Sequence, residues 1–115
     1  MNELVGAVLA FRDERDWRQF HNPKDLAISI SLEAAELLEH FQWKSPAEVA
    51  ASLESEAQRL EVAAEMADVL ILLISLADAM GVDLVAAAKR KLAENARKYP
   101  VERAKGSARK YDDLQ

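Results

Sequence analysis

Four carboxylates in two similar stretches are the residues of this chain best suited to chemistry. The pairs, each with two residues between its members, are Glu33 with Glu36 and Glu65 with Asp68. In a helix this spacing places both carboxylates of a pair on one face, within reach of a shared ligand. Leucines flank the first pair, and the apolar run 69–74 follows the second. Carboxylates in such surroundings are costly to bury unless a cation compensates them, so the pattern predicts two packed helices around divalent metal.

Oxygen ligands of this kind suit hard divalent cations. Magnesium takes one or two carboxylates and completes its octahedron with water and phosphate oxygens, and manganese is a candidate substitute. Two such ions would neutralise the four carboxylates, bind a polyphosphate and lower the pKa of a bound water. Glu61, four residues before Glu65, extends the acidic face and is a candidate for a further ligand or for the base that orients the water.

Two other interpretations of these acidic residues stay open. The glutamates could be solvated on helix exteriors, as most glutamates are, although two pairs inside the most apolar helices favour the metal site. The chain could also be a di-iron carboxylate bundle, which uses Glu-x-x-His motifs. The histidines fit that pattern poorly, because His40 lies four residues after Glu36 and His21 lies outside the predicted helices.

Helix caps and apolar periodicity predict an all-α fold in a single domain, residues 1–115. We expect a short helix over 45–53 and four long helices, over 2–19, 23–41, 55–80 and 83–98. Asn22 and Ser45 are predicted N-caps, and Gly81 is the predicted C-terminal stop. The charged stretch 12–18 is expected to be mostly a solvated helix end, and the polar residues 101–115 an extended tail.

Composition and charge narrow the class of protein further. The chain has 115 residues, of which half are hydrophobic, and no cysteine, which excludes disulfides, thiolate zinc sites and thiol catalysis. The longest apolar run is about half the length needed to span a bilayer, and we expect no signal peptide and a cytoplasmic protein. The net charge of −5 argues against non-specific nucleic-acid binding. The negative charge is compatible with nucleotide binding, because a bound metal ion would reverse the sign of the electrostatic field at its site.

The helix over 55–80 is also expected to mediate self-association. It is apolar on nearly every side between Val69 and Leu76, which is more than a four-helix monomer would need to cover. This predicts a homo-oligomer in which the central helices pack across a two-fold axis.

The motifs resemble those of a known family. Glu33-x-x-Glu36, 28 intervening residues and Glu65-x-x-Asp68 resemble the signature of the MazG-type all-α nucleoside triphosphate pyrophosphohydrolases. Within that family, six stretches spread over nearly the whole chain look like the dCTP pyrophosphatase branch: 11–17, 19–21, 41–44, 68–71, 99–100 and 109–111.

The resemblance implies hydrolysis of a (d)NTP to (d)NMP and pyrophosphate with magnesium, in a dimer or a dimer of dimers (a homotetramer). It implies that Glu33, Glu36, Glu65 and Asp68 are the metal ligands and catalytic residues, and Glu61 is a further catalytic candidate from its spacing to Glu65. The residues that it implies for substrate binding are Trp17, Arg18, Gln19, Phe20, His21, Trp43, Lys91, Asn95 and Tyr99. The branch often has a tyrosine near the base where this chain has Leu72, which removes a hydroxyl donor.

The expected substrate is dCTP or a related pyrimidine dNTP, hydrolysed for nucleotide-pool cleaning or balance. Trp17 and Trp43 suit base stacking, although Trp43 and Tyr99 could instead pack in an interface and Lys91 could be a solvated lysine. A dUTPase-like or phosphoribosyl-ATP-like pyrophosphohydrolase is an alternative, as is a non-catalytic helical interaction module. The tail cations Arg109 and Lys110 are solvated by default, or could fold over triphosphate in a neighbouring subunit.

Overall fold

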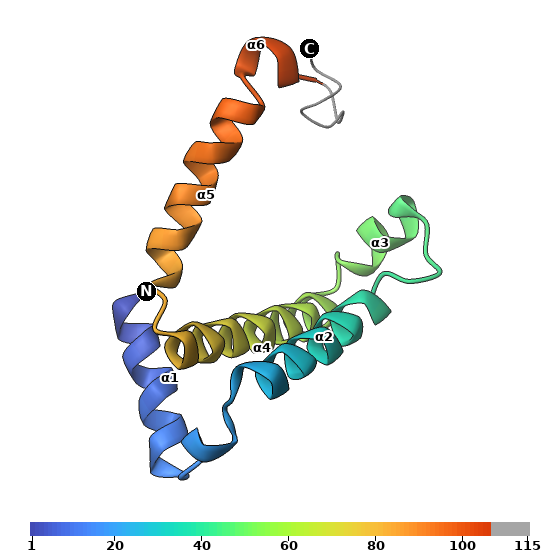
Figure 1. Cartoon of the computed structure of the whole chain (residues 1–115). Coiled ribbons are helices and arrows are strands. Elements are labelled where there is room, and N and C mark those ends of the chain that lie inside the picture. Colours follow the sequence, from blue (N-terminus) through green and yellow to red (C-terminus); the bar gives the residue numbers. More distant parts are fainter. Residues whose placement is uncertain (107–115) are drawn as a thin grey trace. The chain divides into compact units, whose positions relative to one another are not determined.

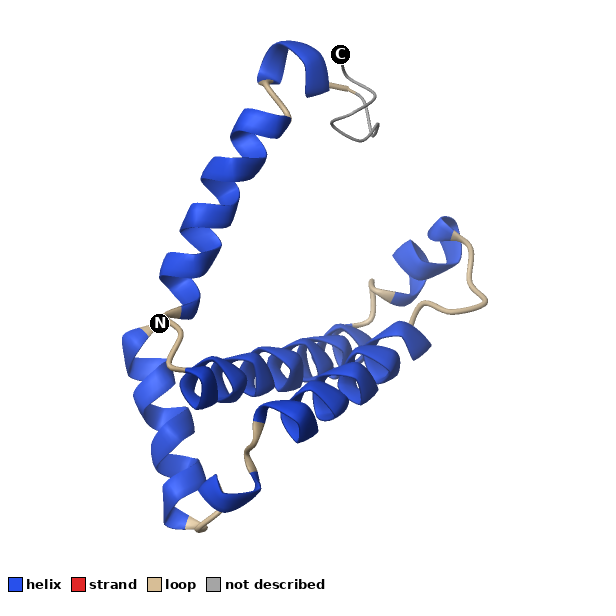
Figure 2. Cartoon of the chain, in the orientation of Figure 1, coloured by secondary structure: helices blue, strands red, loops and turns tan. Residues whose placement is uncertain are grey.

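The structure is a computed structural model that describes residues 1–106 of the chain. It consists of helices joined by short loops, and no strand occurs among these residues (Figures 1 and 2). The predicted all-α fold is therefore confirmed. The helices are α1 (Asn2–Glu14), the 3-10 helix η1 (Arg18–Phe20), α2 (Pro23–Glu39), α3 (Pro46–Ser52), α4 (Glu56–Met80), α5 (Leu84–Lys98) and α6 (Val101–Ala104).

The chain divides into two compact units, Met1–Gly81 and Val82–Gln115, which are described separately. In the first unit, α4 runs antiparallel to α2 and packs along it, and α4 also contacts α1 (Figure 1). The short helix α3 lies in the connection between α2 and α4. The second unit contains α5 and α6. The single domain expected from the sequence stays a prediction.

The predicted caps fix the ends of the two central helices. The Asn22 side chain accepts a hydrogen bond from the backbone N of Asp25 at 2.9 Å, which starts α2. Ser45 and Glu48 form a reciprocal capping box at the start of α3, with both bonds at 3.2 Å. Gly81 ends α4 with φ of +67°, a left-handed conformation that glycine adopts without a steric penalty. These local signals therefore set the ends of the α2–α4 hairpin.

Three details differ from the expectations. The first helix ends at Glu14 and not near residue 19, because Asp16 has a left-handed backbone (φ 53°) before η1 begins. Arg12 is the one exception in the charged stretch 12–18, because it is buried whereas residues 13–18 are exposed as expected. One helical turn, α6, replaces the start of the expected extended tail. Arg109 and Lys110 lie outside the described residues.

The buried apolar core of residues 1–106 is small. It consists of Val8 on α1, Leu26 on α2, and Val62, Ile74 and Ala77 on α4. Many larger apolar side chains of α2 and α4 remain exposed in the single chain, among them Ile28, Leu32, Leu38, Leu60, Met66, Leu70 and Ile71. The α2–α4 hairpin thus leaves a broad apolar surface uncovered.

No single helix within residues 1–106 has both the length and the apolarity needed to cross a membrane. The consecutive helices α4 and α5 meet that criterion only when taken together, and only by length and composition.

Candidate metal centre

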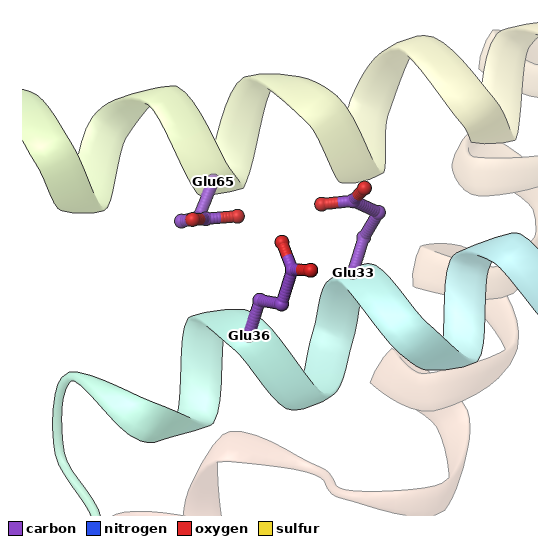
Figure 3. A group of neighbouring side chains, drawn as sticks. All are labelled: Glu33, Glu36 and Glu65. Atoms are coloured by element: carbon purple, nitrogen blue, oxygen red, sulfur yellow. The ribbon is translucent and has the colours of Figure 1, made fainter.

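Three of the four predicted metal ligands meet between α2 and α4. Glu33 and Glu36 lie one turn apart on α2, and Glu65 faces them from α4 (Figure 3). Each offers a carboxylate oxygen, and these three oxygens all lie within 4.8 Å of one another. The antiparallel packing of the two helices therefore brings together carboxylates that are about 30 residues apart in the sequence.

The environment of these carboxylates suits a bound cation. Glu33 Oε2 and Glu65 Oε2 are buried, and neither has a hydrogen-bond partner among the described residues. Desolvation raises the pKa of Glu33, and so do its side-chain hydrogen bond with Glu36 and the negative charges of Glu36, Asp68 and Glu65. A buried, unpaired anionic oxygen is costly unless a positive charge compensates it. The all-oxygen donor set fits a hard divalent cation such as Mg²⁺.

The fourth predicted ligand, Asp68, lies outside this group of three but close to it. Asp68 is exposed on α4, one turn after Glu65, and its charge contributes to the raised pKa of Glu33. Glu61 is exposed on the same helix, four residues before Glu65. Both residues lie on the face of α4 that carries Glu65. Their roles in the site stay predictions.

The raised pKa of Glu33 predicts how the stability of the metal-free protein depends on pH. Its pKa in the folded protein lies above the ordinary value of 4.5. The folded state therefore binds this proton more tightly than the unfolded state does. The stabilisation is fully present below the ordinary value and is lost as the pH rises through the raised pKa.

In EDTA, we expect the urea midpoint of the wild-type protein to fall over that pH interval. The substitution Glu33→Gln should remove most of this fall, because glutamine does not titrate. If the fall is the same in Glu33→Gln and in the wild type, another group causes it and the interpretation is wrong.

The predicted nucleoside-binding segment follows α1. Trp17 caps η1, and its ring meets the Phe11 ring edge-on, with centroids 5.7 Å apart. The Gln19 side chain donates hydrogen bonds to the backbone oxygen and a carboxylate oxygen of Asp16. The other residues of the segment are Arg18, which is exposed, Phe20, which is 63% exposed, and His21, whose Nδ1 is buried without a partner among the described residues.

Trp43 lies in the loop between α2 and α3, where its left-handed backbone (φ 66°) and its exposed fraction of 92% present the ring to solvent. The remaining predicted substrate residues belong to the second unit. Lys91 is exposed and forms an ion pair with Glu94 at 3.6 Å, Asn95 is half-buried, and Tyr99 follows the end of α5. A role in substrate binding stays a prediction for all four residues.

A cavity between α1 and α4 was not predicted from the sequence. It has a volume of about 230 Å³ and is lined by Ala7, Val8, Phe11 and Ile71. All four lining side chains are apolar, and Phe11 also contacts Trp17. The apolar periodicity of residues 2–19 predicted a helix, but the cavity depends on how α1 packs against α4, for which the sequence carries no local signal.

The fold and the site define an all-α protein with a cluster of three carboxylates on an antiparallel helix pair, a donor set that suits a divalent cation. The model of the MazG-like family matches residues 28–114. The chain belongs to this family. The resemblance seen in the motifs, including that to the dCTP pyrophosphatase branch, is confirmed.

Individual relatives agree with this assignment. The rat and human proteins called dCTP pyrophosphatase 1 are 44% and 42% identical to this chain over 104 residues, which cover 90% of it. The chain spans 61% of the length of each of these relatives. A crystal structure of a pyrophosphatase from Archaeoglobus fulgidus has a TM-score of 0.80 and 48% identity, and the match covers 87% of this chain and 92% of that one.

Proposed function

We propose that this protein is a nucleoside triphosphate pyrophosphohydrolase that converts a dNTP to the dNMP and pyrophosphate. The observation that carries the proposal is the group formed by Glu33, Glu36 and Glu65, with its two buried oxygens that lack a partner among the described residues. Such a centre suits Mg²⁺, which binds polyphosphates readily. The names of the relatives, dCTP pyrophosphatase 1 and pyrophosphatase, support this choice of reaction.

The carboxylates would have different roles in the proposed reaction. Glu33, Glu36 and Glu65 would hold the metal, and Asp68 would complete the ligand set. Bound Mg²⁺, or Mn²⁺ in its place, supplies positive charge to the phosphate oxygens and lowers the pKa of a bound water. Glu61 would orient the attacking water and accept its proton.

The nucleoside would bind beside α1. Trp17 exposes aromatic ring surface there, on which a base can stack whatever hydrogen-bonding groups its edge carries. Trp43 lies beyond the opposite end of α2, so its exposed ring would stack on this base only from a second copy of the chain. The cavity next to Phe11 offers apolar side chains only, and Leu72 offers no hydroxyl. The relatives named dCTP pyrophosphatase 1 support a pyrimidine dNTP as the substrate, with dCTP first, and stacking and shape would hold its base. Arg18, Gln19, Phe20 and His21 would complete the nucleoside site, and Lys91, Asn95 and Tyr99 would contact the substrate from the last long helix.

The products test the proposed reaction directly. Incubation of dCTP with the protein and Mg²⁺ should yield dCMP and pyrophosphate in equal amounts by ion-exchange chromatography. Formation of dCDP and orthophosphate would contradict the proposal, because it would place the cleavage at the other anhydride bond. The cytoplasmic location and a role in cleaning or balancing nucleotide pools stay predictions.

We also propose that the protein is a homo-oligomer, a dimer or a tetramer. The support is the apolar surface of α2 and α4, where Leu32 and Met66 are each more than half exposed in the single chain. Exposed apolar surface of this extent is typical of an interface. Light scattering at micromolar concentration should give at least twice the mass of one chain, 12.8 kDa. A monodisperse monomer would contradict this prediction.

A further inference from the structure

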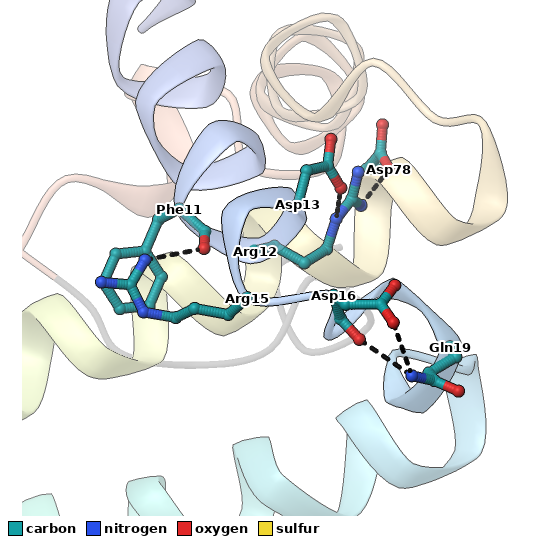
Figure 4. Close-up of polar contacts among 7 residues, drawn as sticks. All are labelled: Phe11, Arg12, Asp13, Arg15, Asp16, Gln19 and Asp78. Carbon is teal, nitrogen blue, oxygen red and sulfur yellow. Dashed lines mark hydrogen bonds and ion pairs between the residues drawn. The ribbon is translucent and has the colours of Figure 1, made fainter.

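Arg12 is the only charged side chain that is buried within residues 1–106, with an exposed fraction of 5%. Its guanidinium donates from Nη1 to Asp78 Oδ2 at 2.7 Å and from Nε to Asp13 Oδ1 at 2.9 Å (Figure 4). A buried guanidinium is tolerated only when its charge and its N–H groups are paired. Both carboxylates therefore contribute to keeping Arg12 in place.

The two partners of Arg12 differ in what they connect. Asp13 is the next residue of the same helix, so this ion pair is local. Asp78 lies in the last turn of α4, 66 residues away in the sequence, so this ion pair ties the end of α1 to α4. The helix α4 also carries Glu65 and Asp68. The contact with Asp78 thus anchors α1 to the helix that provides part of the carboxylate centre.

The backbone of Arg12 holds the start of the nucleoside-binding segment. Its carbonyl oxygen accepts hydrogen bonds from the N of Trp17 at 3.1 Å and from the N of Arg15 at 3.2 Å. The intervening Asp16 has a left-handed backbone, which turns the chain into η1. Arg12 therefore contacts α4 through its side chain and Trp17 through its backbone.

We infer that the ion pair between Arg12 and Asp78 positions Trp17 relative to the carboxylates of α4, and thereby sets the affinity for the nucleoside part of the substrate. This inference rests on the proposed function, because it takes Trp17 to be a stacking residue. Arg12 and Asp78 are positioning residues that act through Trp17. Loss of the Asp78 carboxylate removes the ion pair that ties α1 to α4, so that the end of α1 shifts away from α4. Loss of Asp13, which belongs to the same helix as Arg12, leaves this tie in place. A shift of about 1 Å in a binding group is enough to change kinetics strongly.

Kinetics of Asp78→Ala and Asp13→Ala test the inference. Each substitution removes one carboxylate from Arg12, but only Asp78→Ala breaks the link between the helices. We expect Asp78→Ala to raise KM for dCTP about tenfold with kcat changed less than about twofold, since the carboxylate centre stays intact. Asp13→Ala, the matched control, should change both constants less than about twofold. A loss in kcat with unchanged KM in Asp78→Ala would overturn the inference.

A double-mutant cycle with Trp17→Ala shows whether Asp78 acts through Trp17. The effect of Asp78→Ala on KM should nearly vanish when Trp17 is already absent, because the two residues serve one contact. A tenfold effect that persists in the Trp17→Ala background would contradict the inference. If circular dichroism shows that Asp78→Ala does not fold, the isosteric Asp78→Asn replaces it in the same cycle.

Fluorescence separates this inference from the proposed function. In a Trp43→Phe background, Trp17 is the only tryptophan of the chain. Asp78→Ala should then increase acrylamide quenching of Trp17 and Asp13→Ala should not, whether or not any nucleotide is hydrolysed. Equal quenching in both variants would refute the positioning role. Absence of turnover in the wild type, with the quenching difference present, would refute only the proposed function.

Discussion

Replacing Glu65 with glutamine should lower the turnover of dCTP about a thousandfold and at the same time stabilise the metal-free protein against unfolding. The loss of turnover is of the size seen when one electrostatic contact to a developing charge is removed. The gain in stability follows because Glu65 Oε2 is buried without a partner among the described residues and its charge raises the pKa of Glu33. Glutamine removes that repulsion and keeps the shape of the side chain. The same two effects are expected for Glu33→Gln.

The opposite signs of the two effects make this prediction specific. If Glu65 only supported the fold, its replacement would lower both the stability and the activity of the protein. Glu39→Gln is the matched control, because Glu39 is exposed on α2, outside the group of three carboxylates. Initial rates at saturating Mg²⁺ and urea melts in EDTA measure both effects. If Glu65→Gln remains active within about tenfold of the wild type, the assignment of the metal centre is wrong.

Mg²⁺ should raise the thermal midpoint of the wild-type protein even without nucleotide. A ligand that binds only the folded state at 100 times its Kd adds about 2.7 kcal/mol to the free energy of unfolding. For a chain of this size that corresponds to a shift of about 5 °C or more. The expected cause is compensation of the negative charge shared by Glu33, Glu36 and Glu65.

Two controls separate a metal site from general screening of charge. NaCl at the same ionic strength should give a much smaller shift, because screening acts mainly on exposed charges. The shift with Mg²⁺ should also shrink strongly in Glu65→Gln and persist in Glu39→Gln. Equal shifts with Mg²⁺ and NaCl would contradict a specific site.

Much of the fold and the centre of the site were predictable because their signals are local. The i, i+3 spacing is enough to place Glu33 and Glu36 on one face of α2. The caps at Asn22 and Gly81 fixed where the central helices begin and end. Apolar residues around both acidic pairs indicated that α2 and α4 would pack together, and that packing brings Glu65 to the first pair.

The features that were not predicted depend on contacts between distant residues. Arg12 lies in a stretch of charges that is typical of a solvated helix end, and its burial depends on Asp78, 66 residues further on. The cavity beside Phe11 depends on the packing of α1 against α4 in the same way. The early end of α1 depends on the backbone of Asp16, a residue that also fits inside a helix.

Pyrophosphate release from the four dNTPs, dUTP and 5-methyl-dCTP, with Mg²⁺ or with EDTA, tests the central claim most directly. The account predicts release that requires Mg²⁺ and is fastest with cytosine nucleotides. Equal release from all bases would keep the reaction and reduce Trp17 and Trp43 to stacking surfaces without selectivity. The central claim is that the carboxylates of α2 and α4 form the centre of a metal-dependent pyrophosphohydrolase. Two results would contradict it: release that persists in EDTA, and no release from any of these nucleotides with Mg²⁺.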